Sequence, residues 1–335
     1  MKTILVAVDY SPNSKSALLY ALKMAQKADL KVVVFHSFYY MVSPPAAYDI
    51  PSFIPDLERE KSKELELYVR KTRDALQEDV VITCKHLKHE EQHNNAKPVQ
   101  LRRVFHTTEV TRAHRDSYTA HVTCVAKLGA VYDQVMIAAE IYGVDMIVMG
   151  MQGKGAMGQA ILGSTTISLM RNGRVPVLGV PLHMKYNDSE TVVFASDLRQ
   201  QPNKPLLNKL QNFVRTFCPK LQVLHIDKEH DLKAVQQQVK NALEALDRQL
   251  YDVDYKVILQ QREDVAAGLQ AYLHEHRSDL LVLGPQKHSF LEQLLNKSIT
   301  ARIVANSLCP LLALPAPKTD NQEDIAAENL EHGRV

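Results

Sequence analysis

The chain carries one residue pattern twice, and this repetition constrains its fold more than any other feature. The segment DMIVMG, which begins at Asp145, and the segment DLLVLG, which begins at Asp279, lie 134 positions apart. The same spacing relates three residues of the first copy to three of the second: Asn172, Pro176 and Pro181 to Asn306, Pro310 and Pro315. Because repeated units keep their register when they share a fold, the sequence predicts two copies of one domain in tandem.

Each copy alternates short apolar runs with helical patterns. The runs of the first copy are TILVAV, KVVVFHSF, HVTCVA, DMIVM and PVLGV, and those of the second are TVVFAS, LQVLHI, YDVDYKVILQ, DLLVLG and CPLLALP. Strands that alternate with helices indicate βαβ units and a parallel sheet. Nearly continuous apolar character is typical of strands covered by helices on both faces. We therefore predict an α/β fold of two tandem domains, each a doubly wound, mainly parallel five-stranded sheet.

The length of 335 residues fits this division into two domains. We place the first domain at 1–181 and the second at 191–315. The polar tail at 316–335 has a composition typical of disordered segments.

The first copy is longer than the second by an insertion. ILVAVD ends at Asp9 and VVFASD ends at Asp197, so the first strands are 188 positions apart, 54 more than the spacing of 134 near the domain ends. Much of this excess must lie at about 84–121, a stretch without a sustained helical or strand period. We expect a long inserted loop there.

The insertion is rich in histidine, which raises the question of a metal site. If KHLKHEEQHNN is helical, His86, His89 and His93 share one face and could hold zinc. The spacing matches no compact zinc signature. A solvated, mildly basic insertion is the favoured interpretation, and we assign no metal site.

Composition argues against several classes of partner and compartment. The formal charge of +2, from 40 Lys and Arg against 38 Asp and Glu, gives no reason to expect nucleic acid or an anionic membrane surface. No segment reaches the about 20 apolar residues that cross a bilayer. We expect a cytoplasmic protein with reduced thiols, because the four cysteines are far apart and form no C-x-x-C pair: Cys84, Cys124, Cys218 and Cys309.

A glycine-rich loop, GMQGKGAMGQAILGS, follows the fourth strand of the first copy. It is not a Walker A loop, because Gly158 precedes Gln and Ala where that motif has Lys and Ser or Thr. The dinucleotide pattern G-x-G-x-x-G is present at Gly153, Gly155 and Gly158. That fingerprint belongs after a first strand and needs an acidic residue about twenty positions later, which is missing here. The context disfavours a dinucleotide site.

A different spacing in this loop points to phosphate. Gly150, Gly153, Gly163 and Ser164 form the pattern G-x2-G-x9-G-S. Glycines let the backbone turn and approach a ligand closely, and the helix that follows presents unpaired N–H groups and the positive end of its dipole. Ser164 could either cap this helix or donate to a phosphate. The loop therefore predicts phosphate binding.

With DMIVMG before it and VPVLGVP after it, this spacing resembles the nucleotide signature of the universal stress protein family. The resemblance extends to ILVAVDYSPNSKSALLYALKMAQ and, through the repeat, covers most of the chain except the insertion and the tail. It implies domains of the adenine nucleotide α-hydrolase-like or flavodoxin-like type. It also implies an adenine nucleotide, ATP or AMP, in the first domain, with Mg²⁺ accompanying ATP.

The resemblance also assigns site residues. In the family an Asp after the first strand contacts the adenosine portion of the nucleotide, and Asp9 matches it; an N-cap or turn role is the alternative. Ala7, Val8 and Ser37 match positions that line the base pocket, with Ala7 in place of a common Pro. The complete expected site consists of Asp9, Ala7, Val8, Ser37, Gly150, Gly153, Gly163, Ser164 and Thr165.

The second copy keeps the fold pattern and loses the loop. Of the four residues in the phosphate pattern, only the first and last keep their type, as Gly284 and Ser298; Lys287 and Lys297 replace the two glycines between them. A side chain would obstruct the close backbone approach to a phosphate. We predict that the second domain does not bind nucleotide in the same way.

The resemblance implies a nucleotide-dependent regulator or sensor of the stress response. A slow ATPase or self-phosphorylating enzyme, or a nucleotide-independent scaffold, are the alternatives. No nucleophile-plus-base motif is found, so no catalytic residue is assigned. Because family members commonly dimerise through their last strands, PVLGV and PLLAL are expected to pair within the chain as a pseudo-dimer, while a homodimer stays open. No nucleic-acid or membrane partner is expected.

Overall fold

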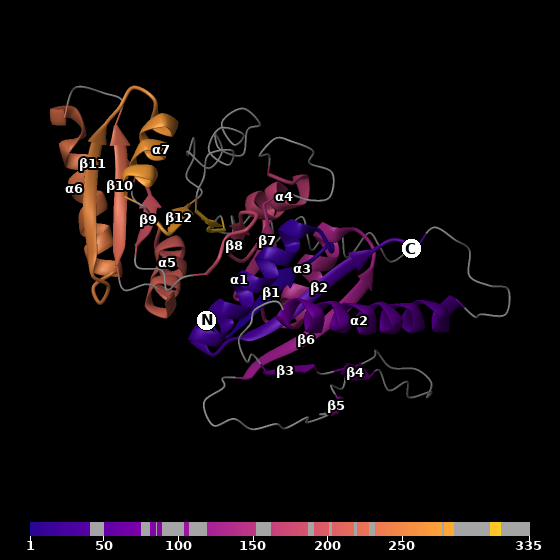
Figure 1. Ribbon diagram of the computed structural model, residues 1–335. Coiled ribbons are helices and arrows are strands. Elements are labelled where there is room, and N and C mark those ends of the chain that lie inside the picture. Colours follow the sequence, from indigo (N-terminus) through magenta and orange to yellow (C-terminus); the bar gives the residue numbers. More distant parts are fainter. Residues whose placement is uncertain are drawn as a thin grey trace, which may run out of the picture.

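The computed structural model describes residues 1–40, 50–74, 81–84, 86–88, 104–106, 119–151, 162–186, 191–200, 203–217, 220–227, 232–276, 278–284 and 309–315. These ranges contain seven helices and thirteen strands (Figure 1). The helices are α1 (Pro12–Ala28), α2 (Ile50–Asp74), α3 (Val131–Ile141), α4 (Ser164–Asn172), α5 (Lys204–Phe217), α6 (Leu232–Gln249) and α7 (Val265–Glu275). The strands are β1 (Thr3–Ala7), β2 (Lys31–Phe38), β3 (Val81–Cys84), β4 (His86–Lys88), β5 (Val104–His106), β6 (Thr119–Leu128), β7 (Met146–Gly150), β8 (Val177–Val180), β9 (Val192–Ala195), β10 (Leu221–Asp227), β11 (Tyr255–Gln261), β12 (Leu280–Leu283) and β13 (Leu311–Ala313).

Eleven of the described strands form one sheet, in the order β11-β10-β9-β12-β13-β8-β7-β1-β2-β6-β3. Five strands of the first copy run β6-β2-β1-β7-β8, and the five of the second run β11-β10-β9-β12-β13. In both copies the third, second, first, fourth and fifth strands along the chain are therefore neighbours in that order. Every pairing within each set of five is parallel. The predicted mainly parallel α/β fold is confirmed, and the two sets of five strands are joined in one continuous sheet rather than forming two separate sheets.

The insertion contains more strand structure than its sequence indicates. β3 pairs in parallel with the first residues of β6, so strands occupy both ends of the segment 84–121. β4 and β5 form a separate antiparallel pair. Strands of three or four residues contain too few alternations to show a period. The rest of the insertion, like the predicted tail at 316–335, lies outside the described residues.

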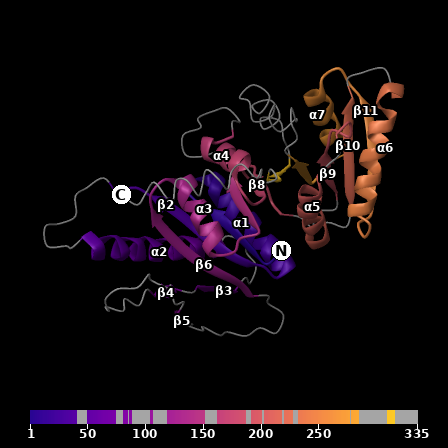
Figure 2. The same ribbon diagram turned by 180° about the vertical axis from the view of Figure 1, so that it is seen from behind.

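Helices cover both faces of the sheet and create an apolar core on each (Figures 1 and 2). One core includes residues of α1, α2, α5 and α6, and the other includes residues of α3, α4 and α7. Successive residues of β1 alternate between them: Ile4 and Val6 face the first core, and Leu5 and Ala7 face the second. Burial on both faces explains the continuous apolar runs of the sequence.

The two copies meet where β8 pairs antiparallel with β13. Leu178 lies opposite Leu312 in this pairing, and both are fully buried. The segment after β8 folds back on α1: the main-chain N–H of His183 donates to the hydroxyl of Ser16 at 3.1 Å. The same hydrogen-bonded sheet and the same two cores therefore run through both copies.

An aspartate repeated in both copies fixes the start of the first strand in each. The Asp145 carboxylate accepts hydrogen bonds from the main-chain N–H groups of Lys2, at 2.6 Å, and Thr3, at 3.1 Å. In the second copy the carboxylate of Asp279 accepts from the N–H of Thr191 at 3.0 Å. The aspartates align the first and fourth strands, so this part of the repeat serves the fold.

Helix α2 covers main-chain groups of β6. β6 continues beyond the residues that pair with β3. In this stretch the N–H of Ala126 donates to the Ser62 hydroxyl at 3.0 Å, and the N–H of Leu128 donates to the Glu58 carboxylate at 3.2 Å. The other oxygen of Glu58 accepts from the Lys127 amine at 2.6 Å. Side chains of α2 thus satisfy donors that a strand edge would expose. Among the described residues, no helix is both long and apolar enough to cross a bilayer.

Candidate functional site

The topology of the first copy creates one favoured place for a ligand. From β1 the chain moves to β2 on one side and later returns to β7 on the other side, and Ala7 lies opposite Met149 in the β1–β7 pairing. In open α/β sheets, ligands bind beyond the carboxyl ends of the strands at such a reversal. Asp9 follows β1, and Gly150 ends β7. The fold therefore brings the two predicted motifs to the same edge of the sheet.

The turn after β1 is held by short-range hydrogen bonds. The Asp9 carboxylate accepts from the N–H of Ser11 at 3.0 Å, and the N–H of Asp9 donates to the Ser14 hydroxyl at 3.3 Å. Ser11 caps α1 by accepting from the N–H of Ser14 at 3.2 Å. Asp9 therefore has the turn role that the sequence left as an alternative, and Ser11, rather than Asp9, is the N-cap. Asp9 is half-buried at the edge of the sheet.

The start of α4 lies beside the end of β7. Gly163 is the N-cap residue of α4, and its N–H donates to the carbonyl of Met151 at 2.8 Å. The Thr166 hydroxyl donates to the carbonyl of Gly150 at 3.2 Å. Since glycine has no side chain, Gly163 itself provides no capping group for the first N–H groups of this helix. Ser164 is its first residue and is exposed, so the capping role considered for Ser164 is wrong.

Thr165, the next residue, is half-buried. The remaining glycine of the predicted pattern, Gly153, lies outside the described residues, as do Lys287, Lys297 and Ser298 of the second copy.

Gly150 is fixed by packing against α1. A Cβ atom added at Gly150 would lie 2.7 Å from the carbonyl carbon and 2.9 Å from the carbonyl oxygen of Asn13. In the second copy a Cβ at Gly284 would lie 2.4 Å from Cδ1 of Leu206 in α5. Each glycine makes room for the first helix of its own copy. This explains why Gly284 persists where the other two glycines of the pattern are lysines.

The predicted base-pocket residues have defined structural roles. Ala7 and Val8 are buried, at 7% and 5% exposure, and the N–H of Val8 donates to the carbonyl of Phe35 at 2.8 Å. Ser37 is half-buried, and its hydroxyl donates to the carbonyl of Gly129. These residues offer main-chain groups and small surfaces at the edge rather than charged side chains.

Sequence reasoning missed an aromatic cluster beside Asp9. Tyr10 has a positive φ of 62°, and its ring lies 4.5 Å from the ring of His36 and 4.9 Å, edge to face, from that of Tyr68. Burial, and secondarily the charge of Glu64, raise the pKa of Tyr10 to about 12. Burial also raises the pKa of Tyr68. Comparing KVVVFHSF with LQVLHI would have found His36, because both strands carry a histidine at the matching place.

The second copy repeats part of this edge. The Asp197 carboxylate accepts from the N–H of Arg199 at 3.1 Å, which is the same two-residue turn that Asp9 makes. An aspartate at this position thus has a structural reason in both copies, and its repetition alone does not indicate a ligand.

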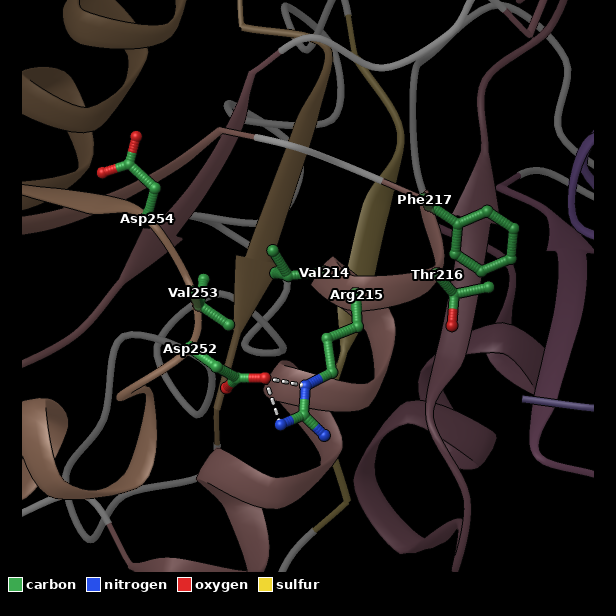
Figure 3. Close-up of a pocket in the computed structure, with 7 residues that line it drawn as sticks. All are labelled: Val214, Arg215, Thr216, Phe217, Asp252, Val253 and Asp254. Atoms are coloured by element: carbon green, nitrogen blue, oxygen red, sulfur yellow. Dashed lines mark hydrogen bonds and ion pairs between the residues drawn. The ribbon is translucent and has the colours of Figure 1, made fainter.

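A shallow recess of the second copy lies at the other end of its strands (Figure 3). It is lined by the end of α5 and the turn before β11. Arg215 donates from Nε to Asp252 at 2.6 Å, and Gln211 donates to the other carboxylate oxygen at 2.6 Å. Although desolvation opposes it, hydrogen bonding from Arg215 keeps the pKa of Asp252 below its usual value. This pair joins the end of α5 to the α6–β11 turn and is remote from the predicted site.

The possible zinc site required a helix that begins near His86, and the structure has a strand there. His86 lies in strand β4, while His89 and His93 fall outside the described residues. In the part of the chain that the structure describes, no group of three or more His, Cys, Asp or Glu side chains is placed to hold a metal ion.

The fold and its repeated edge define a tandem pair of doubly wound α/β domains. The family model of the universal stress protein family matches residues 1–181 and again residues 190–315. The chain therefore belongs to the universal stress protein family and is a tandem member, as its sequence predicted. A comparison with curated proteins gives no match.

Solved structures show the same fold over nearly the whole chain. A universal stress protein from Archaeoglobus fulgidus DSM 4304 is 15% identical, with a TM-score of 0.54, over 95% of this chain and 97% of that one. A functionally unknown protein from Pseudomonas aeruginosa PAO1 is 11% identical, with a TM-score of 0.51, over 98% of this chain and 95% of that one. At these identities the likeness extends to the fold alone.

Proposed function

We propose that the first domain binds an adenine nucleotide, ATP or AMP, at the carboxyl ends of β1 and β7. The observation that carries this proposal is the meeting of two features at the reversal point of the sheet. The Asp9 turn follows β1, and the start of α4, with Gly163 at its N-cap, is hydrogen-bonded to the residue after β7. Both features face the edge at which doubly wound sheets bind ligands.

The phosphates belong at the start of α4. The first N–H groups of a helix and the positive end of its dipole attract anions. Gly163 leaves the approach open because it has no side chain, and the exposed Ser164 offers a hydroxyl donor. In the proposed complex Asp9, which is half-buried at the end of the neighbouring strand, accepts hydrogen bonds from hydroxyl groups of the ribose. Gly153 completes the phosphate pattern by its position in the sequence.

In this proposal the nucleotide acts as a signal rather than as a substrate. Binding changes the surface that a partner meets at this edge of the sheet, which makes the protein a nucleotide-dependent regulator of the stress response. The antiparallel pairing of β8 with β13 supports an intramolecular pseudo-dimer in which the second domain completes the sheet. The lysines at the glycine positions of the second copy support a single phosphate site per chain.

The experiment is to purify the protein without added nucleotide, denature it and identify any released ligand by mass spectrometry. Equilibrium binding of ATP and AMP is then measured with the emptied protein, with and without Mg²⁺. The double variant Gly153→Lys, Gly163→Lys copies the second domain and should bind neither nucleotide. The matched control Gly155→Lys, Gly158→Lys places the same charges on the glycines outside the pattern and should retain most of the affinity. Equal binding by both variants would refute the proposed site.

A second measurement separates binding from catalysis. The protein is incubated with labelled ATP, and phosphate release is followed over many possible turnovers. Binding without turnover is expected. Steady, metal-dependent release that the Gly153→Lys, Gly163→Lys variant abolishes would show an enzyme and overturn the signalling role.

A further inference from the structure

Two histidines occupy the same position in the two copies. Ala7 lies opposite Phe35 in the β1–β2 pairing, and Ala195 lies opposite Leu224 in the β9–β10 pairing. The next residues, His36 and His225, are therefore equivalent. In both, Nδ1 faces a main-chain carbonyl just beyond the first strand of its copy: that of Val8 at 2.8 Å and that of Ser196 at 3.2 Å.

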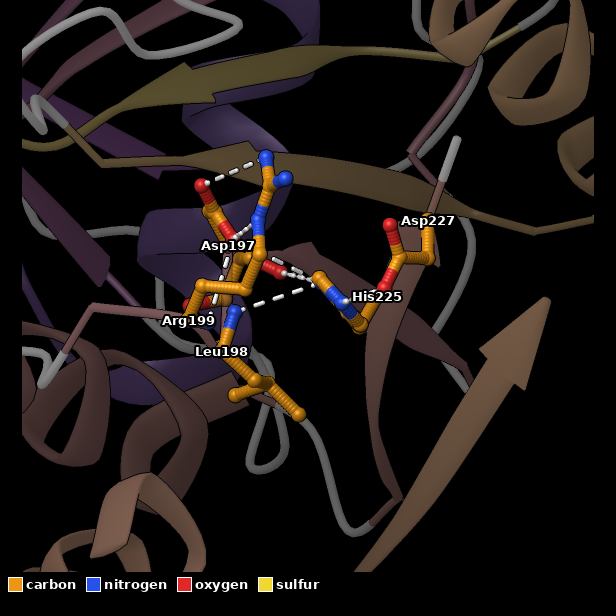
Figure 4. Close-up of polar contacts among 6 residues, drawn as sticks. Asp197, Leu198, Arg199, His225 and Asp227 are labelled. Atoms are coloured by element: carbon orange, nitrogen blue, oxygen red, sulfur yellow. Dashed lines mark hydrogen bonds and ion pairs between the residues drawn. The ribbon is translucent and has the colours of Figure 1, made fainter. Parts of the chain in front are cut away.

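The surroundings of the two rings differ in chemistry. His36 lies between aromatic rings, with Tyr10 at 4.5 Å and Phe38 at 6.4 Å between ring centroids. His225 is only 3% exposed and lies between carboxylates (Figure 4). Its Nδ1 is 3.9 Å from Asp197, and its Nε2 is 3.8 Å from Asp227. Asp227 stands where the first copy has Phe38.

Both carboxylates face a ring nitrogen, but each faces a different one. A metal ion bound at one nitrogen could not reach the carboxylate beside the other, and no described cluster is placed to hold a metal ion. A protonated imidazole carries an N–H on each side and can meet both. Nε2 is buried, and no hydrogen-bond partner for it is found in the described structure. The cation that fits this arrangement is the protonated ring itself.

The charges near the ring also favour a proton. Asp197 is paired with Arg199 from the same turn, at 3.1 Å, and Asp227 lies on the strand of the histidine itself. A carboxylate near each ring nitrogen favours the charged form of the ring. Strand β11 places the uncharged Leu259 opposite His225.

We propose that His225 is a proton-operated switch for the turn between β9 and α5. When the ring is neutral, Nδ1 can accept the N–H of Leu198, which lies at 3.2 Å. Protonated Nδ1 has no lone pair to accept this hydrogen bond and instead donates to the carbonyl of Ser196. Protonation therefore exchanges two main-chain contacts of a turn that corresponds to the Asp9 turn of the first copy.

The switch belongs to the second domain alone and does not depend on nucleotide binding. Leu198 is fully buried, so its N–H cannot turn to water without a movement of the turn. We expect acidification to change the edge of the second domain while the equivalent edge of the first domain keeps its structure.

The test is an NMR titration of the full-length protein with ¹³C-labelled histidine and ¹⁵N-labelled amides. Spectra of His225→Gln and His36→Gln assign the two rings. The ring signal of His225 and the amide signal of Leu198 should shift together as the pH is lowered, with one common midpoint. The turn that contains Tyr10 serves as the internal control and should not follow that midpoint. A Leu198 amide that does not move with His225 would overturn the switch.

Two variants test the role of the carboxylate. Asp227→Asn keeps the shape of the side chain and removes its charge, so the His225 midpoint should fall. Asp197→Asn provides the same test from the other nitrogen should Asp227→Asn fail to fold. Phe38→Asp transplants the carboxylate to the first copy and should raise the His36 midpoint by a similar amount. An unchanged His225 midpoint in the folded Asn variants would contradict the proposal.

Discussion

Single residues of the glycine loop serve different purposes, and Gly150 shows the difference most clearly. Its position in the pattern predicts a phosphate contact. However, a Cβ atom at this position would lie 2.7 Å from the carbonyl carbon of Asn13, so packing alone already requires glycine here. Gly284 has the same kind of role beside Leu206. The positions that distinguish the two copies, Gly153 and Gly163, therefore carry more information about a ligand than Gly150 does.

Substitution of the two packing glycines should have unequal effects. Gly150→Ala forces a Cβ against main-chain atoms at the start of α1, so we expect the free energy of unfolding to fall by about 1–3 kcal/mol. Gly284→Ala meets the end of the flexible Leu206 side chain, which can change rotamer, and should cost less. Urea denaturation of the two variants and the wild type provides the comparison. An equal or larger loss for Gly284→Ala would contradict this account of Gly150.

The thiol of Cys309 should be chemically inert in the folded protein. Burial raises its pKa to about 12, so at pH 8 the folded thiolate fraction is lower by roughly a thousandfold than that of an ordinary cysteine. A variant in which Cys84, Cys124 and Cys218 are Ser isolates this thiol. Its alkylation at pH 8 should be slow in the folded protein and should become fast when urea unfolds the chain. Rapid alkylation without urea would contradict the burial of this thiol.

The same pKa has a consequence for stability with a definite sign. From about pH 9 the unfolded chain loses the Cys309 proton, while the folded protein holds it until about pH 12. Below this window both states are protonated and the group has no effect. Within it, ionisation favours the unfolded state, so the contribution of Cys309 to stability falls as the pH rises.

Among the elements, α2 has a packing role that depends on polar side chains. Its Glu58 accepts the N–H of Leu128 and the amine of Lys127, while Ser62 accepts the N–H of Ala126. The helix thereby protects the stretch of β6 beyond β3. Polar side chains of α2 therefore contribute to its packing against the sheet.

Removal of the Glu58 carboxylate should expose this stretch of β6. Glu58→Ala leaves the Leu128 N–H without its acceptor, and we expect a loss of about 1–2 kcal/mol in the free energy of unfolding together with faster hydrogen exchange of the Leu128 amide. Asp56→Ala on the same helix breaks an exposed pair with Arg59 and should change stability by less than about 0.5 kcal/mol. The interpretation fails if the two variants are equally stable.

The elements that could be predicted from the sequence are those that give a clear residue pattern over several positions. The continuous apolar strands, the repeat at 134 positions and the helix that starts at Ser164 are of this kind. β4 and β5 are too short to give a period. The contact of Gly150 with Asn13 could not be predicted, because it depends on how α1 crosses the end of β7. The nucleotide role of the site residues stays a prediction.

At the scale of the whole molecule, one hydrogen-bonded sheet joins two copies that differ at the carboxyl ends of their strands. The first copy has aromatic rings around His36, and the second has carboxylates around His225. A chain with two equal sites could only respond to more or less of one signal. Our two proposals assign a nucleotide to the edge of the first copy and a proton to that of the second, and the pairing of β8 with β13 joins the two copies in one sheet.

The β8–β13 pairing should therefore couple the stability of the two domains. Leu312 of β13 is fully buried opposite Leu178, so Leu312→Ala leaves a cavity at the junction and should cost about 2–5 kcal/mol. Because β8 loses packing from its antiparallel neighbour, the amides of Val177–Val180 should exchange faster although the substitution lies in the other copy. The control is Leu246→Ala, an equally buried position on α6 far from the junction, which should speed exchange in the second domain and leave β8 protected. Hydrogen exchange followed by mass spectrometry distinguishes the two patterns, and an unaltered β8 in Leu312→Ala would mean that the copies are stable independently of one another.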